Sequence, residues 1–417
     1  MRALAVAVIA GALLWASNVR AGAGTAFADT ARVTALGYAV TARTGDAGTM
    51  LRNPAGLTDV RQPQVLVSAQ ALGLVASFAR AGEPAEDRSR LLGSWGIAAA
   101  TPLPGVLADV KVGFALDVPA GYVLRVAVPV RGDEPSSPVY DGRPDRASAL
   151  FAVAFPLFGV LRVGAGVAVV PSLATPTTVR YVAGRDSTVD RNVVVRLDRD
   201  LDVGFVPFFG LRTTPTPRFS LGFSWRGASY SRATGSQRTI AGGILADDPI
   251  DFFQFWDPET LALGAAWVLG PRASISADVA LARWSRFRSG RDGDVAPRFR
   301  DTLAVRSSIE LTATRWLVVR AGGGFESNPV PEQSLATNYL GASTTMLAAG
   351  AGADLRTLHV PLAIDLQLSG FFGPAQTATK LTHPGETVDD LGYPAFRATA
   401  SAVHFGATVT FFAGGSR

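Results

Sequence analysis

Apolar and polar residues alternate one by one along many short segments of this chain. In one such segment, Leu303, Val305 and Ile309 fall on one face of an extended backbone, and Arg306 and Glu310 fall on the other. A period of two predicts β-strands with one apolar and one polar face. The same alternation recurs in residues 193–205, 218–225 and 359–372.

Alternation also suits a soluble β-sandwich, so the lengths of the connections between the segments are needed to distinguish a sandwich from a membrane barrel. Tight turns such as 213–217, 270–271 and 314–315 alternate with long polar stretches such as 132–146, 231–258 and 327–341. Short connections at one end and long ones at the other are typical of outer-membrane barrels. We therefore predict an all-β fold, a transmembrane antiparallel β-barrel of about fourteen strands. The predicted strands are 64–80, 90–102, 107–118, 148–157, 159–171, 192–211, 217–230, 259–269, 272–287, 301–313, 315–325, 342–355, 358–372 and 400–412.

The first residues have the pattern of an export signal. Arg2 precedes an apolar stretch over residues 3–16, and Val19-Arg20-Ala21 offers small residues for a signal peptidase. We predict a cleaved signal peptide over residues 1–21; a membrane-anchoring helix is the alternative, although the stretch is short for a span. Beyond it, no apolar window reaches the length of a membrane helix, which leaves a closed barrel as the way to cross a bilayer.

Composition excludes several classes of site. The chain has no cysteine, so it has neither disulfides nor a thiolate metal site. Only 18% of its residues are charged, and its arginines do not cluster into a stripe, so we expect no nucleic-acid partner. The histidines His359, His383 and His404 lack the spacing of a metal site or a catalytic triad. We expect no metal, no cofactor and no enzymatic activity.

A turn-rich segment, GDAGTMLRNPAGL at residues 45–57, precedes the first predicted strand. A fourteen-stranded barrel has a lumen that must hold either water or a plug. Irregular backbone is tolerated at membrane depth only where it is buried in protein. We therefore predict a hatch at residues 22–62 that plugs the lumen, a barrel at 63–412 and a short C-terminal tail at 413–417.

Residues 35–57, ALGYAVTARTGDAGTMLRNPAGL, resemble the N-terminal hatch of the FadL-type outer-membrane transporters, a family that includes TodX-like aromatic hydrocarbon transporters. Asn53, Pro54 and Ala55 fall on the NPA signature of that family. Weaker similarity extends over 276–287, 300–334 and 404–412. The chain differs from the family pattern in two places: Leu51-Arg52 stands where many members carry aromatics, and Phe412 is followed by Ala-Gly-Gly-Ser-Arg.

The resemblance implies passive transport of long-chain fatty acids or similar hydrophobic small molecules across the bacterial outer membrane. Extracellular loops would capture the molecule, which would pass behind the hatch and leave laterally into lipid. It also implies a monomer that contacts outer-membrane lipid and needs the barrel assembly machinery during biogenesis. Two alternatives stay open: a structural or adhesive barrel without transport, and an outer-membrane hydrolase built around His404.

Three groups of residues are candidates for the site. The hatch residues Asn53, Pro54, Ala55 and Gly56 either form a purely structural turn or also act as a gate. The aromatic run in a long connection either captures ligand or packs with its neighbours; it comprises Phe252, Phe253, Phe255 and Trp256. Two arginines on polar faces, Arg196 and Arg306, either bind a ligand carboxylate or pair with Asp198 and Glu310, respectively. Trp284 and Trp316, near strand ends, are predicted to belong to an interfacial aromatic girdle.

Overall fold

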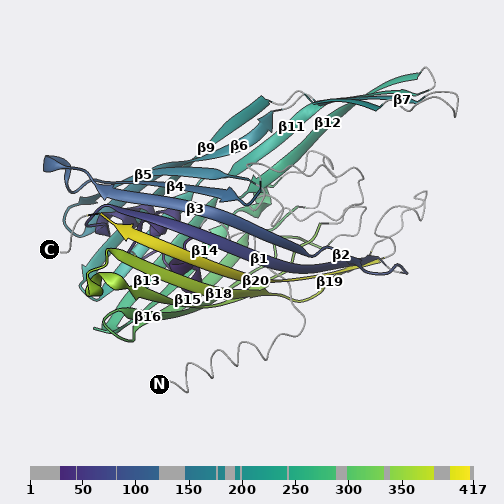
Figure 1. Cartoon of the computed structure of the whole chain (residues 1–417). Coiled ribbons are helices and arrows are strands. Elements are labelled where there is room, and N and C mark those ends of the chain that lie inside the picture. Colours follow the sequence, from purple (N-terminus) through teal and green to yellow (C-terminus); the bar gives the residue numbers. More distant parts are fainter. Residues whose placement is uncertain are drawn as a thin grey trace.

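Strand β1 (Gln64–Arg80) pairs with both β3 (Arg90–Pro102) and the last strand, β20 (Ala395–Phe412), and so closes the sheet into a cylinder. The computed structural model describes residues 29–43, 45–80, 82–121, 146–174, 177–183, 193–197, 200–241, 244–287, 298–332, 339–379 and 395–413. The predicted signal peptide lies outside these residues. The predicted fold class is confirmed: the protein is an all-β, closed, fourteen-stranded antiparallel barrel (Figure 1).

Neighbouring barrel strands follow one another in the chain except where a second sheet intervenes. After β1 and β3 come β4 (Lys111–Pro119), β5 (Ser148–Leu157), β6 (Leu161–Ala174), β9 (Asp200–Thr216), β10 (Phe219–Arg226), β13 (Thr260–Gly270), β14 (Ala273–Ala282), β15 (Thr302–Thr312), β16 (Leu317–Glu326), β17 (Thr344–Asp354), β18 (Leu362–Phe372) and β20. The short strands β2 (Glu86–Asp87) and β19 (Gln376–Thr379) extend the edges of β1 and β20. Short turns lie at one end of the barrel, called here the short-turn end, and long connections lie at the other, the long-loop end.

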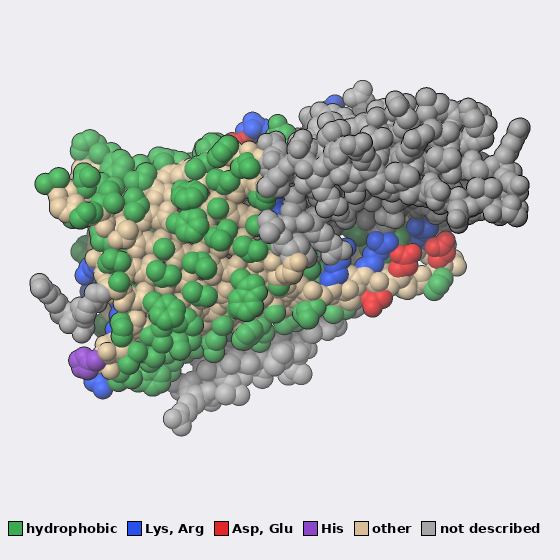
Figure 2. Space-filling view, turned by 45° about the horizontal axis from the view of Figure 1, so that its top comes forward, with side chains coloured by type: hydrophobic (Ala, Val, Ile, Leu, Met, Phe, Trp, Pro, Cys, Tyr) green, Lys and Arg blue, Asp and Glu red, His purple; other side chains and the backbone are tan. Residues whose placement is uncertain are grey.

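The alternation read from the sequence separates the inside of the barrel from its outside. On β15, Thr302, Ala304 and Ser308 are buried, whereas Leu303 and Val305 are 49% and 48% exposed. Figure 2 shows the resulting outer wall, on which hydrophobic side chains cover the barrel. Such an apolar belt is the surface that a lipid-embedded barrel presents. None of the helices in the described part of the chain combines the length and the apolar character of a membrane span.

Four strands form a second sheet that projects beyond the long-loop end (Figure 1). They are β7 (Thr177–Ala183), β8 (Val193–Leu197), β11 (Ser229–Ala241) and β12 (Ile244–Asp257). Two predictions were wrong here. The predicted strand 192–211 is two strands, β8 and β9, in different sheets, and the predicted loop 231–258 is mostly the β11–β12 hairpin. A period of two indicates a strand but carries no information about the sheet it joins.

The described residues before β1 are 29–43 and 45–63, and they form the hatch inside the barrel. The hatch consists of one short α-helix, α2 (Ala31–Ala35), and two 3₁₀ helices, η2 (Ala47–Leu51) and η3 (Pro54–Asp59). Most of its side chains are buried, and they divide the core into two clusters: Met50 and Leu57 pack against β3, β4, β5, β6 and β9, and Val33 and Leu36 pack against β17, β18 and β20.

A charge placed on the outer wall tests its orientation. Val305→Arg puts a guanidinium on the outer face of β15, where we expect a loss of about 2–4 kcal/mol if the residue lies near the bilayer midplane. Val305→Leu is the control and is expected to behave as the unmodified protein. The measurement is urea unfolding in phospholipid vesicles. Equal stability of the two variants would contradict the assignment of this face to lipid.

Candidate functional site

Asn53 joins three separate pieces of backbone at the start of η3. Its Oδ1 accepts a hydrogen bond from the Ala55 N–H (3.0 Å), which caps the helix. Its Nδ2 donates to the carbonyl of Thr41 within the hatch (2.7 Å) and to that of Leu211 on β9 (3.0 Å). Pro54 occupies the first helical position, where its fixed φ and missing N–H are both tolerated. The NPA element therefore fixes its own turn and ties the hatch to the barrel wall.

The hatch packs directly against inward-facing glycines of the barrel wall, called here the glycine seat. If Gly210 carried a Cβ, that atom would lie 1.9 Å from Asn53 Oδ1, and a Cβ on Gly164 would lie 2.4 Å from the Ala55 nitrogen. These distances are far shorter than van der Waals contact, so only a glycine allows the backbones to approach this closely. Other glycines whose added Cβ would come within 3 Å of the hatch are Gly113, Gly222, Gly264, Gly322 and Gly350. The sequence analysis missed this ring, although the signal was visible as glycines on the polar face of the strands.

Charged groups hold the part of the hatch nearest the short-turn end. The Glu310 carboxylate on β15 forms ion pairs with Arg43 of the hatch (2.6 Å) and Arg320 of β16 (2.7 Å). Arg32 of the hatch lies 3.5 Å from the same carboxylate. Arg320 also pairs with Asp365 (2.5 Å). A buried pair is costly to break because the remaining partner keeps an uncompensated charge. This network therefore fixes the position of the hatch more than it adds net stability.

Backbone groups of the hatch also bond to side chains of the wall. The Thr41 N–H donates to Asp278 (2.9 Å), and Ser276 donates to the Ala39 carbonyl (2.7 Å). On the opposite wall, the Ala31 N–H donates to Thr408 (2.9 Å). The irregular backbone of the hatch thus finds inside the barrel the partners that lipid would not supply.

His404 belongs to this polar lining. It is completely buried on β20, between the side-chain amides of Gln70 (3.1 Å) and Gln367 (3.2 Å). Gln70 in turn donates to the carbonyl of Asp29 in the hatch. Ser401 falls on the opposite face of the strand from His404, so this strand does not assemble a nucleophile with a base.

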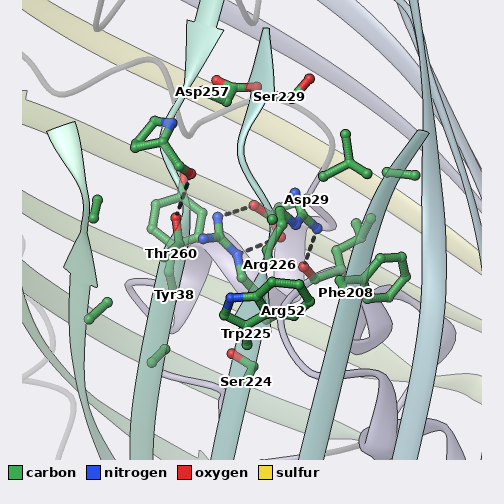
Figure 3. A pocket seen from close by; sticks show the side chains of 18 of the residues that line it. Asp29, Tyr38, Arg52, Phe208, Ser224, Trp225, Arg226, Ser229, Asp257 and Thr260 are labelled. Atoms are coloured by element: carbon green, nitrogen blue, oxygen red, sulfur yellow. Dashed lines mark hydrogen bonds and ion pairs between the residues drawn. The ribbon is translucent and has the colours of Figure 1, made fainter. Parts of the chain in front are cut away.

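A cavity of about 200 Å³ lies between the hatch and the long-loop end of the barrel (Figure 3). The hatch contributes Tyr38, Leu51, Arg52 and Pro54 to it. Much of the barrel wall around it is apolar, namely Leu150, Ala168, Val170, Val206, Phe208, Ala262, Ala280, Ala282 and Ala304. Apolar walls with a few convergent polar groups are typical of small-molecule sites.

Two arginines in the cavity, Arg52 and Arg226, form polar and aromatic contacts with residues of the hatch and the barrel. Arg52 pairs with Asp29 and lies over the ring of Tyr38, 4.4 Å from its centroid. Arg226 of β10 donates to the Leu51 carbonyl (2.8 Å) and lies 5.7 Å from the ring centroid of Phe208. Figure 3 shows the Arg52 and Arg226 side chains converging near the hatch. The sequence analysis did not select these arginines, because their partners are distant in the chain.

Arg306 lines this cavity, as its predicted position on a lumen face requires. Its predicted pairing with Glu310 is wrong: Arg306 pairs with Glu326 of β16 (3.6 Å). Residues four apart on one strand lie about 13 Å apart, whereas cross-strand neighbours lie about 5 Å apart. Arg196 lies on β8 of the second sheet and not on a barrel strand, and its side chain lies outside the described part of the structure. A ligand-binding role for either arginine stays a prediction.

The predicted aromatic loop, residues 252–256, belongs to strand β12. The side chains of Phe252, Phe253 and Phe255 lie outside the described part of the structure. Trp256 stacks on Tyr230, with ring centroids 5.3 Å apart and an interplanar angle of 19°. Their role in ligand capture stays a prediction.

Trp284 is not a girdle residue, contrary to the prediction. It is buried, with 4% of its surface exposed, in an aromatic cluster at the long-loop end that also contains Phe287, Phe299, Val330 and Tyr339. The strand predicted for 272–287 ends at Ala282, and the 3₁₀ helix η5 (Trp284–Arg286) turns the chain inward. Trp284 also lines the cavity, so the aromatic cluster borders it. Trp316, in the β15–β16 turn at the short-turn end, is 39% exposed, and its place in a girdle stays a prediction.

Glu259 fixes the connection into β13 beside the cavity. The Trp225 indole donates to its carboxylate (3.0 Å), and Arg283 and Arg286 approach to 3.3 and 2.5 Å. The indole hydrogen bond, together with the two arginine charges, holds the pKa of Glu259 below its ordinary value. Among the described residues, no group of acidic or histidine side chains is arranged to hold a metal ion.

Solved structures share this architecture over nearly the whole chain. A Pseudomonas aeruginosa FadL homologue is 14% identical, with 95% of this chain and 99% of that chain covered and a TM-score of 0.62. The Pseudomonas putida toluene transporter TodX is 16% identical over 91% and 97% (TM-score 0.55), and the Ralstonia pickettii toluene transporter TbuX is 15% identical over 92% and 98% (TM-score 0.52). The sequence matches no protein-family model and no curated protein. The predicted FadL-like fold is confirmed.

Removing the glycine seat should loosen the hatch. Gly210→Ala places a methyl group against Asn53, whereas Gly204→Ala on the same strand meets nothing closer than 3.6 Å. We expect Gly210→Ala to raise ion conductance in planar bilayers and Gly204→Ala to leave it unchanged. Identical conductance of the two variants would contradict the role of Gly210 as a seat.

Asn53→Ala should release η3 because it leaves two carbonyls without their donor, at about 1–3 kcal/mol for each buried group. Asn53→Asp keeps the acceptor for Ala55 but loses both donors, so we expect a similar effect. Amide hydrogen exchange of residues 55–59 should accelerate while that of the barrel strands stays unchanged. Asn328→Ala is the matched control, because the Asn328 side chain bonds to Val330, two residues along the chain. Unaltered exchange in both Asn53 variants would show that the hydrogen bonds of Asn53 are not needed to hold η3 in place.

Proposed function

We propose that this protein is a passive channel of the bacterial outer membrane for small hydrophobic molecules. The observation that carries the proposal is the largely apolar cavity inside a closed barrel, bounded on one side by the hatch and lined at the long-loop end by Trp284. A molecule would enter from the long-loop end, lodge in the cavity and pass behind the hatch. The FadL-like fold, shared with two toluene transporters, supports this reading.

Lateral exit into lipid is the step that the chemistry of the substrate favours. A hydrophobic molecule gains about 25 cal/mol for each Å² of apolar surface withdrawn from water. Leaving the cavity through the short-turn end would expose that surface to water, and leaving through the wall would not. The apolar outer face of the barrel supports the same route. Asn53, Pro54, Ala55 and Gly56 are the proposed gating element, because they hold the hatch to β6 and β9.

The size of the cavity favours a compact substrate. An apolar cavity of about 150 Å³ accommodates benzene, so about 200 Å³ suits a single substituted ring. A long-chain fatty acid, the substrate class first implied by the sequence, would need the hatch to move before it could be enclosed. We therefore rank small aromatic molecules ahead of long-chain acids within the same proposal.

The setting of the protein follows from the same proposal. The chain would be exported with a signal peptide at residues 1–21, which is then cleaved. The barrel assembly machinery would insert it into the outer membrane, where it would be a monomer surrounded by lipid. No cofactor and no nucleic acid would take part. A second candidate function, adhesion without transport, is favoured by one observation, the sheet of β7, β8, β11 and β12 that projects beyond the barrel.

Filling the cavity should abolish binding. Ala280 is 5% exposed and faces the cavity from β14, whereas Ala277 faces outward on the same strand. Ala280→Trp is expected to lower the affinity for toluene at least tenfold, because the indole takes the space that the ligand would occupy. Ala277→Trp should bind as the unmodified protein does. The measurement is a titration of detergent-purified protein, and equal affinity in both variants would rule out this cavity as the binding site.

A further inference from the structure

Two neighbouring turns at the short-turn end expose apolar side chains. The β3–β4 turn presents Val106 (101% exposed) and Leu107 (52%), and the β5–β6 turn presents Phe158 (87%) and Val160 (56%). The two turns are adjacent because β4 pairs with β5. These four residues are called here the apolar rim. Each is at least as exposed as the outer-wall residue Val305 (48%).

The same short sequence pattern builds both turns. Residues 102–107 read PLPGVL and residues 156–161 read PLFGVL. Each has a glycine with positive φ, Gly105 at 66° and Gly159 at 75°. Phe158 also has a positive φ, 52°, a conformation that asparagine or glycine adopts far more easily. An exposed aromatic in a strained turn position is poorly explained by the needs of the turn and indicates a contact surface.

The other hairpin turns at this end are different in character. Within the described residues, each of the remaining four carries an exposed arginine: Arg218, Arg272, Arg315 and Arg356. Arg356 is ion-paired to Asp354 (2.6 Å) and lies 4.0 Å from the ring centroid of Phe412. These four turns are called here the basic turns; one of them, the β17–β18 turn, also exposes Leu358 (52%) and Val360 (45%), and the β3–β4 turn holds one exposed acidic residue, Asp109.

The apolar rim is continuous with the outer wall of the barrel. On β5, Phe151 (49% exposed), Val153 (39%) and Phe155 (39%) point outward in a row that leads directly to Phe158. Figure 2 shows hydrophobic side chains reaching the edge of the barrel at its upper left. A water-facing turn is expected to carry exposed polar residues, as the basic turns do with Arg218, Arg272, Arg315 and Arg356. Continuity with the outer wall therefore favours lipid as the occupant.

We propose that the apolar rim inserts into the inner leaflet of the outer membrane, at the boundary between headgroups and acyl chains. Aromatic rings favour this boundary, and arginines reach the phosphates from it. The barrel would then sit deeper in the leaflet on the side of β3 to β6 than on the side of the basic turns. This inference rests on the proposed membrane setting of the protein.

Single cysteines test the depth of the rim directly, because the chain has none of its own. Spin labels would be attached to Phe158→Cys and Val106→Cys in phospholipid vesicles, with Val153→Cys on the outer wall and Pro217→Cys in a basic turn as references. Accessibility to oxygen and to a water-soluble nickel complex reports depth. We expect the labels at 158 and 106 to match 153 and to differ from 217.

The spin-label results distinguish the position of the apolar rim from the membrane setting of the whole barrel. If 158 and 106 match 217 while 153 is in lipid, the rim faces water and the inference is wrong. If 153 is also in water, the membrane setting fails and the inference falls with it. As a second measurement, Phe158→Asn should weaken folding into vesicles about tenfold, as expected for an aromatic side chain withdrawn from lipid, without weakening folding in detergent. Ala313→Asn, in a basic turn, should change neither, and an equal loss in both solvents for Phe158→Asn would also overturn the inference.

Discussion

Every backbone N–H and C=O at membrane depth must find its partner within the protein, and the rest of this structure follows from that constraint. The pairing of β1 with β20 removes the free edges of the sheet, so a closed barrel results. Closure leaves a lumen wide enough to need filling. The hatch fills it, and because its own backbone is irregular, it needs partners along the wall. Asp278, Ser276 and Thr408 supply them.

The hatch is held by close packing and by charge, and both kinds of contact are compatible with the proposed gating. Close packing on Gly164 and Gly210 fixes its position by shape, and the Glu310 network fixes it by charge. Neither involves a covalent bond, and Leu51 and Pro54 line the cavity on the long-loop side, where a molecule bound as proposed would contact them. Under the proposed function, the free energy of binding in the cavity would act on the segment that the hydrogen bonds of Asn53 hold in place. The proposed gate and the proposed binding site are therefore one contiguous unit.

The fold was largely predictable from the sequence, because lipid imposes the alternation that a reader can see. Leu303, Val305 and Ile309 had to face outward wherever β15 was placed. The wrong strand predictions have a common physical origin: residues that pair in a sheet can lie far apart in the sequence. Periodicity assigned residues 192–211 to one strand although they belong to two sheets, and it took 231–258 for a loop.

The candidate site was less predictable for the same reason. The NPA element was found because its residues are adjacent in the chain. Arg306 was placed on the correct face but with the wrong partner, since its neighbour Glu326 comes from the next strand. Arg52 and Arg226 were missed because nothing near them in the sequence indicates Asp29 or Leu51 as partners.

The central claim is that hydrophobic molecules cross the outer membrane through this barrel. The most direct test is the initial rate of radiolabelled toluene uptake by cells that lack their own channel of this kind, with and without this protein. A hydrophilic sugar of similar size serves as the reference solute. Our account predicts faster uptake of toluene and no change for the sugar. An unchanged toluene rate, with the protein correctly folded in the outer membrane, would contradict it.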